Sequence, residues 1–220
     1  MISESHKFIF IHIPKCAGTS IENALRRYCK KGFLGYDKDL KGLKQHANCH
    51  ELLTHNYITS EMCDSFFKFA FVRNPWERCV SQYIWRIKKG GNFVNGPGNV
   101  KNGFSHPNFN QKFVRNNVTF RQFLEKDFPW QEMSFEQHMR PQVEFIYDCT
   151  KTKLDFIGKF ENINNDFSYV CNKLIGEQVE LPHANKSSNN QNYKQYYDNY
   201  TKDLVSEFYY EDIKEFNYTF

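Results

Sequence analysis

The chain of 220 residues has no apolar run long enough to cross a membrane, and its mean hydropathy is −0.71. Residues 1–7 are few and mostly polar, so we expect neither a signal peptide nor a membrane anchor. The sequence also has no CxxC pair, and its 7 cysteines are scattered. Without a secretory signal, such cysteines predict reduced packing residues rather than a disulfide framework.

A strong excess of one charge is also missing, because the formal net charge is only +4. A nucleic-acid footprint requires basic residues clustered on one face, so we predict no nucleic-acid partner. The middle third does hold a local excess of basic residues. Both a solvated surface and a groove that binds a substrate are open interpretations of it. The residues concerned are Arg86, Lys88, Lys89, Lys101, Lys112, Arg115 and Arg121.

The length and the lack of internal repeats are typical of one domain, which we assign to residues 1–220. Short apolar runs alternate with helical patterns, which predicts an α/β protein. The segment 90–117 is rich in glycine, proline and asparagine and predicts a long loop, which we expect to cover the binding site. Apolar spacing predicts a helix over 201–216, and another helical stripe that begins at Phe167 stops at Gly176.

The most informative segment is a loop that follows an apolar strand. Residues 8–13 predict the strand, which leads through the loop into a helix. The first turn of a helix presents unpaired N–H groups and the positive end of the dipole, so it accommodates a phosphate. Gly18 allows a close approach of the backbone, and Lys15 adds a mobile cation. Thr19 and Ser20 add hydroxyl donors.

This loop differs from the nucleoside-triphosphatase consensus GxxxxGK[ST], because its lysine precedes the glycine instead of following it. A magnesium-bound triphosphate is therefore not the ligand that the loop predicts. An ordinary strand-to-helix turn with a surface lysine is the alternative interpretation. Cys16 lies inside the loop, and we interpret it as a small packing residue, with a reactive thiol as the alternative.

A second cation lies at the end of another predicted strand. Residues 69–72 form a short apolar run that ends at Arg73, and Pro75 fits the first position of the helix that follows. Ser81 lies about two turns along that helix, on its polar side. Because ligands of open α/β sheets bind at the carboxyl ends of strands, we expect Arg73 and Lys15 to point at one crevice.

Taken together, the segments PKCAGTS and FVRNPWERCVS resemble the two phosphosulfate-binding segments of sulfotransferases that use 3′-phosphoadenosine 5′-phosphosulfate (PAPS). The resemblance is closer to the carbohydrate sulfotransferases and spans nearly the whole chain. It implies a P-loop NTPase-like three-layer α/β fold with a central, mainly parallel sheet flanked by helices. The further stretches that carry it are 44–48, 138–142, 154–162 and 181–187, of which we expect 154–160 to be a strand.

The resemblance also implies roles for residues of the two segments. Lys15 would stabilise the leaving phosphate oxygen, and Arg73 and Ser81 would bind the 3′-phosphate. No metal is implied. The 5′ side of the donor would lie on Lys15, Cys16, Ala17, Gly18, Thr19 and Ser20.

Two later stretches complete the predicted site. Lys186 and Ser187 belong to a loop that resembles the one closing over the 3′-phosphate, with a polar connector as the alternative. His138, Arg140 and Gln142 would contact the acceptor or the donor, with a helix-surface cluster as the alternative.

Transfer to a hydroxyl requires a base, and the segment 44–55 holds three histidines. The resemblance places the catalytic histidine at His46. Gln45 intervenes in the motif, so His50 remains the second choice, and a surface or capping role remains possible for each. Zinc is not predicted, because the HELLTH stretch has one residue more than the HExxH motif.

The resemblance implies a hydroxyl acceptor, which we expect to belong to a glycan, and leaves the oligomeric state open. Golgi members of the family are luminal and membrane-tethered, so the missing anchor predicts a soluble, cytoplasmic enzyme of bacterial or viral source. The alternative function is a P-loop-like nucleotide-binding module or kinase without sulfotransferase activity.

Overall fold

A four-stranded sheet forms the centre of the molecule, with the strand order β1-β2-β3-β4. β1 (Ile2–Ser3) is antiparallel to β2 (Phe8–Ile11), whereas β2, β3 (Phe67–Val72) and β4 (Phe156–Lys159) are parallel. The predicted α/β class with a mainly parallel sheet is therefore confirmed. The computed structural model describes residues 1–29, 45–85, 119–127, 138–182 and 192–220.

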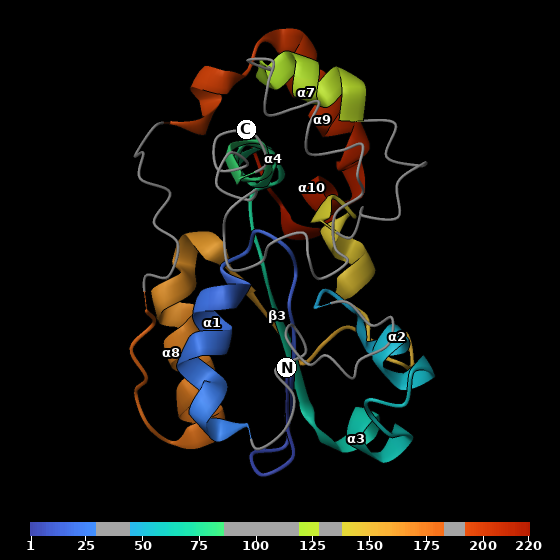
Figure 1. Cartoon of the computed structure of the whole chain (residues 1–220), viewed down its shortest axis with the longest axis vertical. Helices are drawn as coiled ribbons and strands as arrows, with labels where there is room; N and C mark the ends of the chain where they lie inside the picture. The colour runs from blue at the N-terminus through green and yellow to red at the C-terminus, as the bar shows by residue number, and fades with distance from the viewer. Residues whose placement is uncertain (30–44, 86–118, 128–137, 183–191) are drawn as a thin grey trace, which may run out of the picture.

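Helices cover both faces of the sheet, as Figure 1 shows. α1 (Gly18–Leu25) and α8 (Ile163–Ile175) lie on one side of β3, and α2 (Cys49–Thr54) and α3 (Ser60–Ser65) lie on the other. Because both faces are covered, the central strands are apolar throughout, and Phe8, Phe10, Phe69 and Phe71 have almost no exposed surface.

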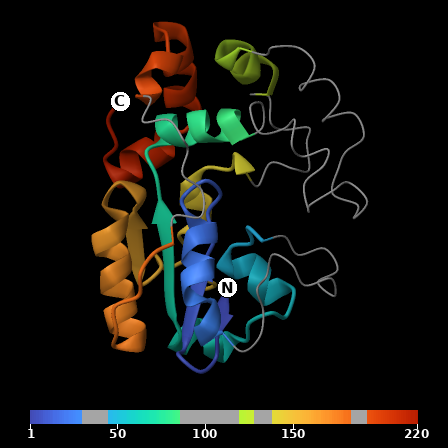
Figure 2. The same ribbon diagram turned by 60° about the vertical axis from the view of Figure 1, so that its left-hand side comes forward.

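The remaining helices lie beyond the carboxyl end of the sheet (Figure 2). They are α4 (Pro75–Tyr83), α7 (Phe120–Asp127), α9 (Asn199–Phe208) and α10 (Tyr210–Phe216). Short 3-10 turns are η1 (Arg26–Tyr28), η6 (Gln142–Phe145), η7 (Phe160–Asn162) and η8 (Tyr193–Tyr196). Among the described helices, none combines the length and the apolar character that crossing a bilayer requires.

Several predicted boundaries change. β2 ends at Ile11, earlier than predicted, so His12 already belongs to the loop. The stripe that stops at Gly176 is α8, and Gly176 ends it in the left-handed region with φ 74°. The predicted helix over 201–216 is wrong as a single element. Tyr209, with φ −102° and ψ 28°, separates α9 from α10, and its buried side chain donates from Oη to the Met139 carbonyl at 2.8 Å. The predicted loop 90–117 lies outside the described residues.

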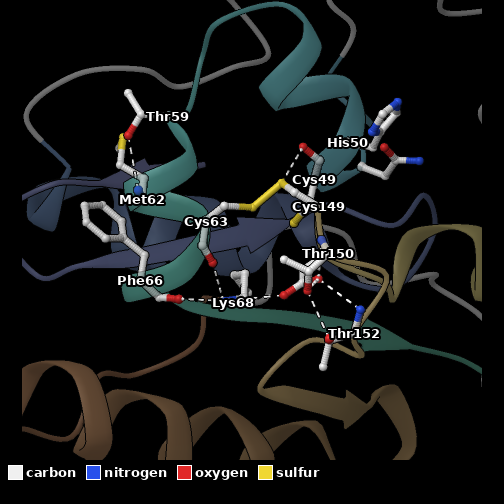
Figure 3. The surroundings of a disulfide bond; sticks show 12 residues. Cys49, His50, Thr59, Met62, Cys63, Phe66, Lys68, Cys149, Thr150 and Thr152 are labelled. Carbon is white, nitrogen blue, oxygen red and sulfur yellow. Dashed lines mark hydrogen bonds and ion pairs between the residues drawn. A yellow bond between two sulfur atoms is a disulfide. The ribbon is translucent and has the colours of Figure 1, made fainter.

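The prediction that all cysteines are reduced is wrong for one pair. Cys63 of α3 and Cys149, which follows η6, form a disulfide across a sequence separation of 86 residues (Figure 3). No spacing pattern indicated this pair, because the two residues meet only through the folding of α3 against the segment that leads to β4. The remaining cysteines, Cys16, Cys29, Cys49, Cys79 and Cys171, are free thiols.

Candidate active site

The loop between β2 and α1 has an uncommon backbone. Lys15 and Ala17 lie in the left-handed region with φ of 68° and 64°, although neither is glycine. This conformation strains a residue that has a side chain by roughly 1 kcal/mol or more, so the surroundings must hold it. Arg78 donates from Nε to the Pro14 carbonyl at 3.1 Å, and Arg73 donates from Nη1 to the Lys15 carbonyl at 3.2 Å. The end of β3 and α4 therefore fix the shape of this loop.

Arg73 lies at the carboxyl end of β3, as predicted, and is only 8% exposed. Its Nη2 donates to Oε1 of Glu77 at 2.8 Å, and its guanidinium carbon lies 4.0 Å from the centroid of the Phe160 ring. Its Nε is buried and has no hydrogen-bond partner. Burying a charged N–H group without a partner is unfavourable, so Arg73 retains a donor for an anion.

Arg78 of α4 is a site residue that sequence reasoning missed. It is 2% exposed, and its Nη2 donates to the carbonyls of His138 at 3.1 Å and Arg140 at 2.9 Å. Its Nη1, like Nε of Arg73, is buried without a partner. Helical periodicity assigns an arginine to the solvent side, but α4 is buried on almost every side, so no pattern in the sequence marked this residue.

The predicted donor-binding residues within the described part of the chain lie on the loop before α1, in α1, at the end of β3 and in α4. Thr19 is half-buried and Ser20 is buried in the first turn of α1, and Ser81 is half-buried on α4. Nζ of Lys15 lies 5.1 Å from the centroid of the Trp85 ring. Lys186 and Ser187 lie outside the described residues. Three cationic side chains, a helix N-terminus and two unpaired guanidinium N–H groups fit a ligand with several anionic groups, such as PAPS.

Gln142 links the loop between β2 and α1 to the end of β3. It has no exposed surface, and its amide bonds the backbone of Arg73 on both sides, from Arg73 N to Oε1 at 2.8 Å and from Nε2 to Arg73 O at 2.9 Å. The thiol of Cys16 donates to the same Oε1 at 3.3 Å. Buried Asp212 accepts from the backbone N–H groups of Gln142 and Val143. The amide of Gln142 is therefore engaged inside the protein, where it joins the Arg73 backbone to the loop between β2 and α1.

Cys16 is a packing residue by its environment. It is buried, and this burial raises the pKa of its thiol to about 12 despite the nearby arginines. A thiol with such a pKa is protonated at neutral pH and is a poor nucleophile. This agrees with the packing interpretation of Cys16.

His46 lies in the centre of a cluster of rings. Its Nδ1 is 2.9 Å from the His12 carbonyl, and its ring meets those of His12 and His138 edge to face, with centroids 4.6 and 4.7 Å apart. Because a carbonyl oxygen only accepts, Nδ1 carries the proton and Nε2 remains an acceptor. Burial, and then the charges of His12, Arg78 and Lys15, hold the pKa of His46 well below its usual value. The imidazole is therefore neutral at physiological pH.

A buried pair beside His46 was not predicted. Nδ1 of His12 lies 2.9 Å from Oε1 of Glu22, and Nε2 of Gln45 donates to Oε2 of the same carboxylate at 2.8 Å. A Cβ atom on Gly18 would lie only 2.1 Å from Cδ2 of His12. Gly18 is therefore needed because the His12 ring packs against it. The signal for this pair, a histidine at a strand end ten residues before a helical glutamate, is too weak to identify it from the sequence.

The other candidate residues separate into two groups. His138 belongs to the ring cluster, because it stacks on Trp85 with centroids 5.1 Å apart. Arg140 instead forms ion pairs with Glu51 at 3.0 Å and Glu144 at 2.9 Å. His50, the second choice for the base, is exposed on α2. The described residues hold no group of three or more histidine, cysteine, aspartate or glutamate side chains that could bind a metal.

Comparison with known proteins finds several carbohydrate sulfotransferases among the relatives of this chain. Carbohydrate sulfotransferase 9 of Homo sapiens is 28% identical over 247 residues, which cover 99% of this chain and 52% of the relative. Carbohydrate sulfotransferase 11 of Rattus norvegicus is 25% identical over 186 residues, which cover 80% of this chain and 52% of the relative. The chain thus spans about half the length of these relatives.

An uncharacterized protein of Archaeoglobus fulgidus is also 25% identical over 142 residues, which cover 64% of this chain and 94% of the relative. No solved structure matches the chain significantly. A model of the Sulfotransferase family matches residues 1–219. Because this match covers nearly the whole chain, including both cationic strand ends and the histidine cluster, the protein belongs to the sulfotransferase family.

Proposed function

We propose that the protein transfers the sulfuryl group of PAPS to a hydroxyl group of a carbohydrate. One observation carries this proposal: Arg73 and Arg78 both bond the loop that carries Lys15, and each keeps a buried guanidinium N–H without a partner. A buried charged N–H group without a partner is unfavourable, and a bound anion would relieve that cost. The sulfotransferase family generally uses PAPS, which supplies a sulfuryl group already attached to a phosphate leaving group.

The residues of α1 and α4 would hold the donor at two places. The first turn of α1, with Thr19 and Ser20, would bind the 5′-phosphate, and Arg73 with Ser81 would bind the 3′-phosphate. Lys15 would stabilise negative charge on the leaving phosphate oxygen, where a cation is most effective because that charge develops during transfer. Lys186 and Ser187 remain proposed donor contacts.

His46 would act as the base. Its Nε2 would accept the proton of the acceptor hydroxyl as the hydroxyl oxygen bonds to sulfur and the bond from sulfur to the phosphate oxygen breaks. The resulting imidazolium would keep its Nδ1–H bond to the His12 carbonyl. His138, whose ring meets that of His46 and stacks on that of Trp85, would contact the acceptor.

The names of the relatives support a sugar as the source of the hydroxyl, because they are carbohydrate sulfotransferases. The single domain over 1–220 and the cytoplasmic location stay predictions. The direct test incubates the purified protein with PAPS and a panel of glycans and measures formation of 3′-phosphoadenosine 5′-phosphate (PAP). Sulfated product and PAP in equal amounts are expected. No PAP with any acceptor, or tighter binding of magnesium ATP than of PAP in calorimetry, would favour a kinase or a binding module.

Two substitutions test the assigned chemistry. Lys15→Met should lower kcat by about 1,000-fold, since it removes the cation at the leaving oxygen. Lys7→Met is the matched control, because Lys7 is also a non-glycine residue of positive φ, 49°, but lies exposed at the opposite end of β2. His46→Ala should lower kcat by about 100- to 10,000-fold, and His55→Ala, an exposed histidine after α2, should not. Loss of activity in His50→Ala instead would transfer the role of base to His50.

A further inference from the structure

The ring of His12 lies between the start of α1 and His46. On one side, its Cδ2 and Nε2 occupy the position where a Cβ of Gly18 would be, 2.1 and 2.2 Å from it. On another side, its centroid is 4.6 Å from that of the His46 ring at an angle of 89°. The same residue also accepts, through its carbonyl, the hydrogen bond of His46 Nδ1. One imidazole therefore separates the predicted phosphate-binding turn from the predicted base.

The orientation of this ring is fixed by buried polar groups. Glu22 is 1% exposed, and its two carboxylate oxygens are shared between His12 and Gln45. Burial alone would raise the pKa of Glu22, but the hydrogen bond and charge of His12 and the Gln45 amide lower it, so the carboxylate is ionised. The ring also stacks on Phe10 with centroids 6.0 Å apart. Turning the ring would leave a buried carboxylate without its partner, which is strongly unfavourable.

We propose that His12, held by Glu22 and Gln45, is a positioning residue that fixes the separation between the donor-binding turn of α1 and the base His46. The proposal rests on the proposed function. Transfer requires the base, the acceptor oxygen and the sulfur to lie nearly in line at contact distance, and a misplacement of 1 Å can slow such a reaction by about 100-fold. Because His12 touches both sides, its shape sets this spacing, whereas the arginines set only the shape of the loop.

Two variants separate the space that the His12 ring fills from the hydrogen bond that it forms with Glu22. His12→Phe keeps an aromatic ring between Gly18 and His46 but loses the bond to Glu22. His12→Asn places an amide where Nδ1 lay, so it can keep that bond, but it leaves the space of the ring empty. Each should lower kcat by about 10- to 100-fold. Each should change the dissociation constant of PAP by less than about threefold, since Arg73, Arg78 and Gln142 hold the loop independently.

A structural role alone is distinguished by combining these variants with His46→Ala. If His12 acts by positioning His46, the His12 substitutions should reduce the residual rate by less than about twofold once His46 is absent. Equal losses in both backgrounds, or a fall in PAP affinity that parallels the fall in kcat, would overturn the proposal. Glu22→Gln guards against variants that fail to fold, because it keeps the ring and an acceptor for His12 Nδ1, and it should lower kcat by about threefold to tenfold.

The pH profile gives a further readout that a folding defect would not move. The titratable and charged groups around His46 are His12 with Glu22 behind it, Lys15 of the loop, Arg78 of α4, and His138 of the segment before η6. His12→Phe removes the neighbour whose charge contributes most to lowering the pKa of His46, so the acidic limb of kcat/KM should move to higher pH. A limb that moves while kcat at its plateau stays unchanged would contradict the proposal, because His12 would then act on His46 through charge alone. An inactive wild-type protein would instead contradict the proposed function itself.

Discussion

Charge is buried at both ends of the sheet, but its partners differ. At the amino end of β3, Nζ of Lys68 donates to the carbonyls of Cys63 at 2.6 Å and Phe66 at 3.2 Å (Figure 3). It also lies 3.4 Å from Asp155 and 3.8 Å from Asp148. At the carboxyl end, Arg73 and Arg78 each keep a buried N–H group without a partner.

The difference separates a structural charge from a binding charge. Lys68 has two carbonyl groups and two carboxylates around its Nζ, so its donors are satisfied within the fold. The guanidinium groups of Arg73 and Arg78 are incompletely paired, and the folded protein bears that unfavourable energy. The Cys63–Cys149 disulfide reinforces the amino end, whereas strained residues Lys15 and Ala17 lie at the carboxyl end.

The largest expected effect is on stability at the amino end. Lys68→Met removes the cation from two carbonyl groups and from Asp148, so we expect the free energy of unfolding to fall by about 3–5 kcal/mol. Urea denaturation measures this change. Lys173→Met is the control, because Lys173 is exposed and its Nζ lies over the Phe67 ring at 5.2 Å, which predicts a loss of about 1 kcal/mol or less. The affinity of Lys68→Met for PAP should not change. A weaker affinity would contradict the assignment of Lys68 to structure and of the arginines to binding.

A somewhat smaller loss is expected when the disulfide is removed. The double variant Cys63→Ala, Cys149→Ala frees a loop of 86 residues in the unfolded chain, which predicts a loss of roughly 2–4 kcal/mol. Thermal unfolding with and without reductant should show the same loss in the native protein and none in the double variant. A melting temperature of the native protein that ignores the reductant would contradict the disulfide.

The sequence predicts the two ends unequally. Lys15, Gly18 and Arg73 could be identified because each lies in a short pattern of strand, loop and helix that determines its own local geometry. Arg78 was not identified, and Gln142 was expected to contact the acceptor or the donor rather than the Arg73 backbone, because the contacts of both residues lie sixty or more residues away in sequence. The same limit applies to the disulfide, whose two cysteines lie in segments that only the folded sheet brings together.

The site itself shows the same division. His46 was chosen by resemblance, and the structure gives that choice a neighbourhood of rings that His50 lacks. His12 and Glu22 were not identified, because a buried ion pair across the strand-to-helix loop has no periodic signature. Gly18 was predicted to allow the close approach of a ligand, and the structure shows a separate reason for it, because the His12 ring lies where a Cβ atom would be.

At the carboxyl end we expect an effect on binding rather than on stability. Arg73→Met removes a cation with an unpaired N–H, so the dissociation constant of PAP should rise by about 10- to 100-fold. The loss of unfolding free energy should be smaller than for Lys68→Met, because the bonds to the Lys15 carbonyl and to Glu77 are lost together with an unfavourably buried N–H group. Calorimetric titration with PAP and urea denaturation measure the two quantities. Arg73→Lys keeps the charge but loses the planar guanidinium, so its dissociation constant for PAP should lie between those of the native protein and Arg73→Met. Unchanged PAP binding in Arg73→Met would remove it from the donor site.

The smallest effect concerns the pH dependence of stability. It tests whether every buried charge at the carboxyl end of the sheet serves to bind a ligand. Glu22 is paired there with His12, and its lowered pKa means that the folded state binds its proton less readily than the unfolded state. The stability that this pair contributes is therefore present above the usual pKa of 4.5 and is lost as the pH falls through the lower folded value. The difference in unfolding free energy between the native protein and Glu22→Gln should narrow as the pH falls below 4.5. A constant difference would mean that Glu22 is not ionised in the folded protein, and the orientation of His12 would then need another explanation.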